Sequence, residues 1–144
     1  MKQRHSYTDL LYHLVFRTKY RTPFIDNEEV EATLYGFLRS KANDLDAWIE
    51  EIGGWTEHVH LLLRSRPSVA LSTVYGQMKG FAAWAWHKHW PDRAFGWDDG
   101  VWAKTVDPED CDALREYIRN QRRHHAQKSE LRRWEPDDVR VMLL

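Results

Sequence analysis

Two histidines separated by one residue, His58 and His60, lie in the apolar stretch EHVHLLL from Glu57 to Leu63. On a β-strand, side chains two residues apart point to the same face, so these two imidazoles should lie side by side. Such a pair can ligate a metal ion. The spacing alone is a weak signal, because it also occurs by chance and paired strand histidines often form only hydrogen bonds.

The same spacing recurs at His87 and His89, where it predicts something different. These residues lie at the end of a predicted helix, and residues two apart on a helix diverge by about 200°. We therefore expect this second pair to lie on the surface.

A tyrosine and a glutamine four residues apart, Tyr117 and Gln121, form the second group that could do chemistry. Residues at this spacing share one face of a helix, which brings a phenol and an amide oxygen together. A phenol beside a divalent cation and basic side chains becomes a usable nucleophile. Tyr117 also neighbours Leu114 and Ile118, and on the helix alone a place in the core is the favoured interpretation.

Hydrophobic periodicity and turn residues predict the elements that must position these groups. We expect strands at Leu10 to Phe16, Ala47 to Ile52, Trp55 to Arg64 and Ala94 to Val106, with Gly53-Gly54 turning the second into the third and an irregular turn at Gly100 in the last. We expect helices from an N-cap at Asp26 or Asn27 to about Asn43, from Pro67-Ser68 to before Pro91, and from an N-cap at Asp107 to about Gln127, and we assign no structure to the tail from Trp134.

This order predicts an α+β, ferredoxin-like (RRM-like) βαββαβ fold with an added C-terminal helix that bears the tyrosine. The four strands should form one antiparallel sheet with the helices on one face. The length of 144 residues fits a single domain over residues 1–144.

The charge distribution bears on nucleic-acid binding. The formal net charge of −1 argues mildly against a nucleic-acid partner. Basic residues nevertheless cluster, and local clusters can hold phosphates. The candidate DNA contacts are Arg17, Lys19, Arg21 and Lys79. For each one taken singly, an ordinary solvated cation is an equally good interpretation.

A single cysteine, Cys111, excludes an internal disulfide framework and a cysteine-rich zinc cluster. The sequence shows no apolar run of about 20 residues and no signal peptide. It also shows no phosphate-binding glycine loop. We therefore expect a cytoplasmic protein with no membrane partner and no nucleotide cofactor.

Taken together, the motifs resemble those of the single-tyrosine HUH (His-hydrophobic-His) transposases of insertion-sequence type, including the REP-associated tyrosine transposases. The resemblance rests on YHLVFRTKYRTPFI (Tyr12 to Ile25), EHVHLLL, the step Gln77-Met78-Lys79-Gly80-Phe81, and EYIRNQRRHH (Glu116 to His125), in the family order. These motifs cover most of the chain from Tyr12 to His125.

The resemblance implies a metal-dependent endonuclease and strand transferase that acts on single-stranded DNA. It implies that His58, His60 and Gln121 bind Mg²⁺ or Mn²⁺, with His124 as a candidate substitute for Gln121. It also implies that Tyr117 forms a 5′-phosphotyrosine and frees a 3′-OH.

The expected partner is single-stranded DNA, as hairpin-forming element ends. The resemblance allows a homodimer in which one subunit's tyrosine completes the other's site, and equally a monomer acting in cis. Two alternatives stay open: a replication-initiator-like HUH nuclease, and a non-catalytic or domesticated nucleic-acid-binding module of the same fold.

Overall fold

A computed structural model of the chain describes residues 7–136. The strands are β1 (Leu10–Arg17), β2 (Trp48–Gly54), β3 (His58–Ser65) and β4 (Trp102–Thr105), and the helices are α1 (Glu28–Asp44), α2 (Leu71–His89), α3 (Cys111–Arg119) and α4 (Gln121–Gln127). All strand pairs are antiparallel, and the sheet order is β2-β3-β1-β4. The predicted α+β, ferredoxin-like arrangement is confirmed.

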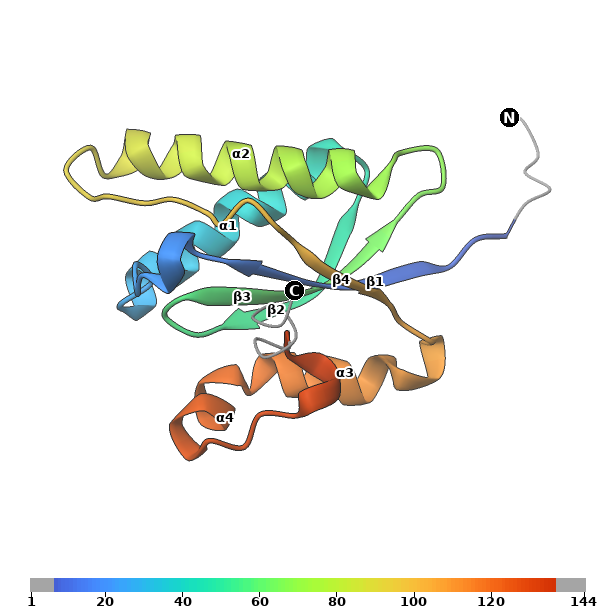
Figure 1. Cartoon of the computed structure of the whole chain (residues 1–144). Coiled ribbons are helices and arrows are strands. Elements are labelled where there is room, and N and C mark those ends of the chain that lie inside the picture. The colour runs from blue at the N-terminus through green and yellow to red at the C-terminus, as the bar shows by residue number, and fades with distance from the viewer. Residues whose placement is uncertain (1–6, 137–144) are drawn as a thin grey trace.

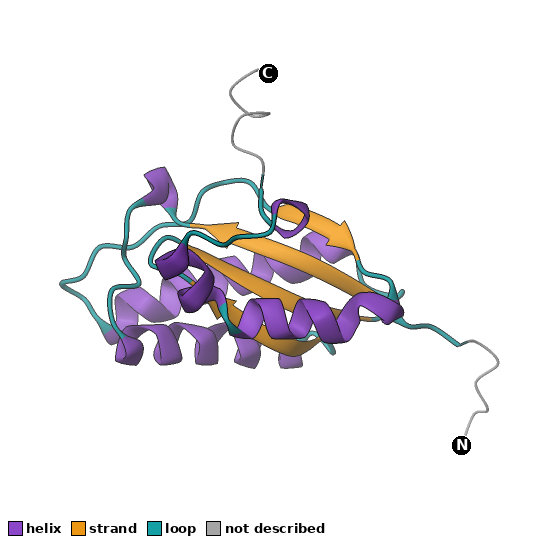
Figure 2. Cartoon of the chain, turned by 90° about the horizontal axis from the view of Figure 1, so that it is seen from below, coloured by secondary structure: helices purple, strands orange, loops and turns teal. Residues whose placement is uncertain are grey.

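The helices cover both faces of the sheet, so the prediction that they lie on one face was wrong. Figure 1 shows α1 and α2 on one side and α3 with α4 on the other, and Figure 2 shows the second side turned toward the viewer. Leu61 and Leu63 pack in the core beneath α1 and α2, whereas Leu62 packs with Leu114 and Ile118 of α3. A strand covered on both faces is apolar at consecutive positions, as the three leucines of β3 are.

The two glycines predicted to form a turn lie inside β2 instead. Gly53 pairs with His60 and Gly54 with Val59, and the turn follows them at residues 55–57. A Cβ on Gly53 would lie 2.1 Å from the backbone oxygen of Ile118. The glycine is therefore required by the close approach of α3 to the sheet, and not by a turn conformation.

The predicted third helix is divided in the structure. The Asp107 side chain accepts a hydrogen bond from the backbone N–H of Glu109 (2.9 Å), as an N-cap should, and a 3₁₀ turn then leads into α3. The backbone leaves the helical conformation at Asn120 (φ −100°, ψ 22°), and α4 begins at the next residue. Tyr117 and Gln121 consequently belong to two consecutive helices.

Other predicted bounds shift by smaller amounts. The N-cap of α1 is Asn27, whose side-chain oxygen accepts from the N–H of Val30 (2.9 Å). Residues 67–70 form a turn ahead of α2 and not its first turn. The last strand is only β4, and Trp97 upstream of it makes an isolated bridge to Thr18. Within residues 7–136, no helix is both long enough and apolar enough to cross a membrane.

Candidate active site

His58 and His60 of β3 face α3 and α4, as the two-residue period predicts. Both side chains are buried, and their ring centroids lie 5.0 Å apart. The pairing of β1 with β3 places Arg17 opposite His58 and Val15 opposite His60. The two imidazoles therefore lie near the beginning of an inner strand of the sheet, beneath the helices that carry the tyrosine and the glutamine.

His60 interacts through its Nδ1 with another buried histidine, His13. Its Nδ1 lies 2.9 Å from the Nε2 of His13 on β1, whose ring packs edge-on against Trp102 at 4.8 Å. Burial is the main cause that lowers the pKa of His60 to about 4, so this imidazole is neutral at neutral pH. Its Nε2 faces the carboxylate of Glu135 at 3.2 Å.

His58 is oriented in the same way by a carboxylate. Its Nδ1 lies 2.6 Å from Oε1 of Glu57, which leaves its Nε2 turned toward the Gln121 amide oxygen at 3.4 Å. Burial alone would raise the pKa of Glu57, but its hydrogen bond to His58, the charge of His58 and Arg21 outweigh burial and lower the pKa to about 2. Glu57 is therefore an ionised acceptor for the His58 N–H.

Two residues of α4, one turn apart, reach the same point. The Nε2 of His125 lies 3.1 Å from the Gln121 amide oxygen and 3.1 Å from the Nε2 of His58. The His125 ring stacks on Trp55 at 5.5 Å, and the amide nitrogen of Gln121 donates to the backbone oxygen of Tyr117 at 3.4 Å. The amide oxygen of Gln121 is thereby turned toward the histidines.

Tyr117 is buried and hydrogen-bonded through its hydroxyl. The hydroxyl donates to Oε1 of Glu135 at 2.6 Å and accepts from the backbone N–H of Leu131 at 3.0 Å. Burial, followed by the hydrogen bond to Glu135, raises the pKa of the phenol above its ordinary value. The protein's own groups thus keep this tyrosine as a neutral phenol.

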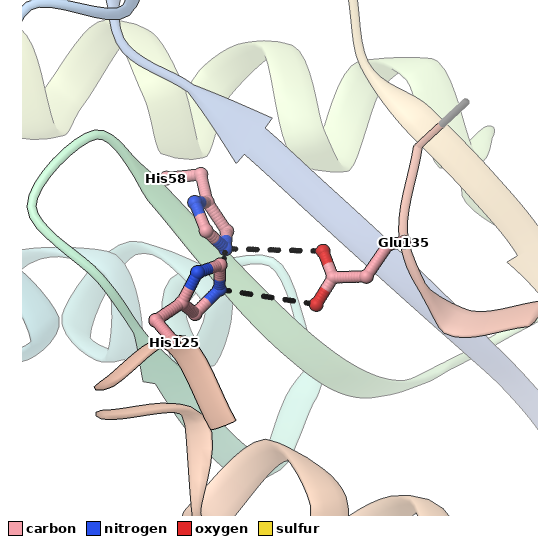
Figure 3. A group of neighbouring side chains, drawn as sticks. All are labelled: His58, His125 and Glu135. Atoms are coloured by element: carbon pink, nitrogen blue, oxygen red, sulfur yellow. Dashed lines mark hydrogen bonds and ion pairs between the residues drawn. The ribbon is translucent and has the colours of Figure 1, made fainter. Parts of the chain in front are cut away.

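The donor atoms of this site fit a divalent cation. Figure 3 shows His58, His125 and Glu135 turned toward one another, and their candidate ligand atoms all lie within 4.8 Å of each other. The amide oxygen of Gln121 adds a neutral oxygen at the same point. Imidazole nitrogens with carboxylate and amide oxygens are ligands that Mg²⁺ and Mn²⁺ accept.

A family model described as "Transposase IS200 like" matches residues 6–121 of the chain. The chain belongs to the IS200-like transposase family. The resemblance inferred from the motifs is confirmed, and with it the class of enzyme, a DNA transposase. The transposases for insertion sequence element IS200 of Salmonella typhimurium strain LT2 and of Salmonella typhi are each 26% identical to it over 123 residues, 81% of this chain and 80% of theirs.

Solved structures show the same fold as this transposase. A putative transposase from Deinococcus radiodurans R1 has a TM-score of 0.66 and 26% identity, with 84% of this chain and 97% of that chain covered. A REP-associated tyrosine transposase bound to a REP hairpin has a TM-score of 0.59 and 14% identity, with 83% and 71% covered. At that lower identity the second likeness concerns the fold alone.

The basic residues proposed as DNA contacts do not all lie at the transposase site. Arg17 and Arg21 line a cavity of about 220 Å³ together with His58 and His125, and Lys19 is exposed on the adjoining loop. Lys79 lies on α2, on the opposite face of the sheet.

Lys79 is buried, and its ammonium donates to the backbone oxygens of Asp98 (2.6 Å) and Gly100 (3.0 Å). Burial lowers the pKa of this ammonium. Its observed partners hold the loop that precedes β4, so Lys79 is not brought to the site of His58 and Tyr117.

Sequence reasoning missed three residues of the site: His13, His125 and Glu135. His125 could have been found, since it lies one helical turn beyond Gln121. His124, the substitute ligand that we considered, instead stacks on Tyr117 at 4.5 Å and lies 3.0 Å from the Ser129 hydroxyl. No local pattern points to Glu135, which lies in the tail to which no structure was assigned.

Proposed function

We propose that this transposase cuts and rejoins single-stranded DNA by transesterification, with Tyr117 as the nucleophile. The observation that carries the proposal is a shared carboxylate. Oε1 of Glu135 accepts a hydrogen bond from the Tyr117 hydroxyl at 2.6 Å, and its Oε2 lies 3.2 Å from Nε2 of His60. A nucleophile and a histidine pair that meet at one carboxylate can act on one phosphate.

In the proposed step, the Tyr117 oxygen attacks the scissile phosphorus and the bond from phosphorus to the 3′ oxygen breaks. The products are a 5′-phosphotyrosine and a free 3′-OH, with the phenolic proton lost and a proton gained by the 3′ oxygen. The energy of the cleaved ester is kept in the new ester, so a later attack by a 3′-OH can reverse the step without a nucleotide cofactor.

His58, His60 and Gln121 are the residues that we propose as metal ligands. Mg²⁺ or Mn²⁺ bound there would polarise the phosphate and favour the ionised form of a phenol that the protein alone keeps neutral. The buried positions of His58 and His60 fix the two imidazoles in one orientation before any ligand binds.

The proposed substrate is single-stranded DNA at hairpin-forming element ends. A relative of the same fold was solved with a REP hairpin, which supports DNA of this kind as the partner. Arg17 and Arg21 line the cavity beside His58, which supports them as contacts to its phosphates.

We also propose that the tyrosine acts in cis. Tyr117 and His60 of one chain already meet at Glu135, with ring centroids 6.0 Å apart. This arrangement supports a site that needs no second copy of the chain.

The test is the formation of a covalent adduct. The protein is incubated with labelled single-stranded oligonucleotides from the flanks of its gene, with Mn²⁺ or with EDTA, and run on a denaturing gel. We expect an adduct that needs the metal and is absent in Tyr117→Phe. Binding of the oligonucleotides without an adduct, unchanged in His58→Ala, would instead support the non-catalytic binding module.

A further inference from the structure

We propose that His125 and Glu135 are ligands of the same divalent cation, and that the metal centre of this chain has five protein ligands. The inference deepens the proposed function and rests on it, since His58, His60 and Gln121 are the ligands that the family motifs indicate. It assigns a new role to α4 and to the tail that follows it.

The Nδ1 atom of each of the three histidines lies close to a polar group of a neighbouring side chain. The Nδ1 of His58 lies 2.6 Å from Glu57, and the Nδ1 of His125 lies 2.9 Å from Glu130. The Nδ1 of His60 lies 2.9 Å from Nε2 of His13. A neutral imidazole that donates its Nδ1–H to an acceptor presents an unprotonated Nε2 on its other side.

The Nε2 atoms of His58 and His125 turn to one region, and the Nε2 of His60 faces Glu135, the carboxylate that borders that region. The Nε2 atoms of His58 and His125 are 3.1 Å apart, and the amide oxygen of Gln121 is 3.4 Å from the first and 3.1 Å from the second. Unprotonated nitrogens and an amide oxygen have lone pairs but no hydrogen to share between them. One bound cation satisfies all of them, whereas hydrogen bonds among them cannot.

Glu135 supplies the negative charge that this set otherwise lacks. Its Oε2 lies 3.2 Å from Nε2 of His60 and 3.9 Å from Nε2 of His58, and its Oε1 lies 4.0 Å from Nε2 of His125. Three imidazoles and an amide are neutral, while Mg²⁺ and Mn²⁺ favour carboxylate oxygen. Glu135 is the carboxylate that faces all three histidines.

The ligand role of Glu135 also places the nucleophile. The Oε1 that faces His125 accepts the hydrogen bond of the Tyr117 hydroxyl, and the backbone N–H of Leu131 donates to that same hydroxyl. The tail from Glu130 to Glu135 thus contacts the site at His125, at Tyr117 and at the proposed metal. It is part of the metal centre and not an appendage to it.

Mn²⁺ affinity of the whole chain, measured by isothermal titration calorimetry without DNA, tests the proposal. We expect Glu135→Gln and His125→Ala each to weaken Mn²⁺ binding at least about tenfold, because loss of a ligand should cost no less than loss of a group that only orients a ligand. Glu28→Gln, at an exposed glutamate of α1, and His87→Ala, at an exposed histidine of α2, are the matched controls and should bind as the wild type does. Circular dichroism verifies that each variant is folded.

Unchanged Mn²⁺ affinity in both folded variants would overturn the proposal. If Glu135→Gln binds Mn²⁺ as the wild type does and forms the adduct faster, the proposal is also overturned. The carboxylate would then only occupy the position that the DNA phosphate takes. The adduct assay with Tyr117→Phe separates the two claims. If wild type forms the adduct while the ligand variants bind Mn²⁺ normally, only the five-ligand centre fails; if affinity falls but no adduct forms, only the proposed function fails.

Discussion

His13 lies behind His60, with its Nε2 2.9 Å from the Nδ1 of that imidazole, and it is itself buried. Residues behind a metal ligand fix its tautomer and orientation, and their loss weakens metal binding by about 10–100-fold. We therefore expect His13→Phe to raise, by about that factor, the Mn²⁺ concentration that gives half-maximal adduct formation. Saturating Mn²⁺ should restore the yield, because Tyr117 is untouched.

His87→Ala is the control for this prediction, since His87 is an exposed histidine at the end of α2. It should leave the Mn²⁺ dependence unchanged. A His13 variant that folds and needs no more Mn²⁺ than the wild type would show that His13 only fills space.

Individual residues of the site were predictable where a local period governs them. The alternation of a strand was enough to place His58 and His60 together, and the helical period could also have placed His125. His13 and Glu135 meet these residues only through strand pairing and the return of the tail. Contacts between residues far apart in the chain leave no local pattern in one sequence.

The close approach of α3 to β2 depends on Gly53. A Cβ there would lie 2.1 Å from the backbone oxygen of Ile118, and a backbone atom cannot turn aside as a side chain can. We expect Gly53→Ala to lower the free energy of unfolding by about 1–3 kcal/mol, the usual cost of overpacking. It should also reduce adduct formation, because α3 carries Tyr117. Urea denaturation and the gel assay measure the two effects.

Gly76→Ala provides the matched comparison. Gly76 is an exposed residue of α2, and a Cβ there would meet nothing within 4 Å. Alanine is the better helix former, so this variant should gain about 0.5–1 kcal/mol. Equal stabilities of the two glycine variants would contradict the account of the contact between α3 and β2.

The ammonium of Lys79 connects α2 to the loop before β4. Because it donates to two backbone oxygens, we expect Lys79→Met to lower the free energy of unfolding by about 1.5–3 kcal/mol. The DNA affinity of this variant, measured at saturating Mn²⁺, should be unchanged.

Arg17→Ala should instead lower the DNA affinity. It should also reduce the slope of the salt dependence of that affinity by about 1, because one phosphate contact is lost.

A Lys79 variant with normal stability and a reduced salt dependence would reverse these assignments. Fluorescence anisotropy with a labelled oligonucleotide over a range of salt concentrations distinguishes the two cases. The comparison also tests directly which of the basic residues noted in the sequence contact DNA.

Element types were predictable, and several of their bounds were not. A continuous helical pattern runs through Asn120, yet the backbone breaks there and turns Gln121 and His125 toward β3. The pair Gly53-Gly54 looks like a turn in sequence, whereas it makes room for a helix. The glycine is explained by the close approach of α3, a contact between distant segments that no local pattern encodes.

At the scale of the whole molecule, Tyr117 and His60 of one chain lie close together, with ring centroids 6.0 Å apart. If Tyr117 acts in cis, a mixture of Tyr117→Phe and His58→Ala proteins should form no adduct, because neither chain holds both groups. Recovery of the adduct in the mixture, measured on the same denaturing gel, would show that a second chain supplies the tyrosine.

The order of strands and helices was enough to predict the ferredoxin-like sheet, because that order admits few topologies. The side on which the added helices lie could not be predicted. That side depends on which face of β3 is apolar and must be buried by a helix. The run Leu61, Leu62 and Leu63 is apolar on both faces, so it favours neither side. The layer formed by α3 and α4 on the second face of the sheet places the tyrosine over the histidines.

The most direct test of the central claim is to locate the DNA on the protein. After incubation with a cleavable oligonucleotide and Mn²⁺, the adduct is digested with trypsin and nuclease, and the modified peptide is sequenced by mass spectrometry. We predict a nucleotide phosphate on Tyr117. A nucleotide on any other residue, or a cleaved oligonucleotide with no modified peptide, would contradict covalent catalysis by this tyrosine.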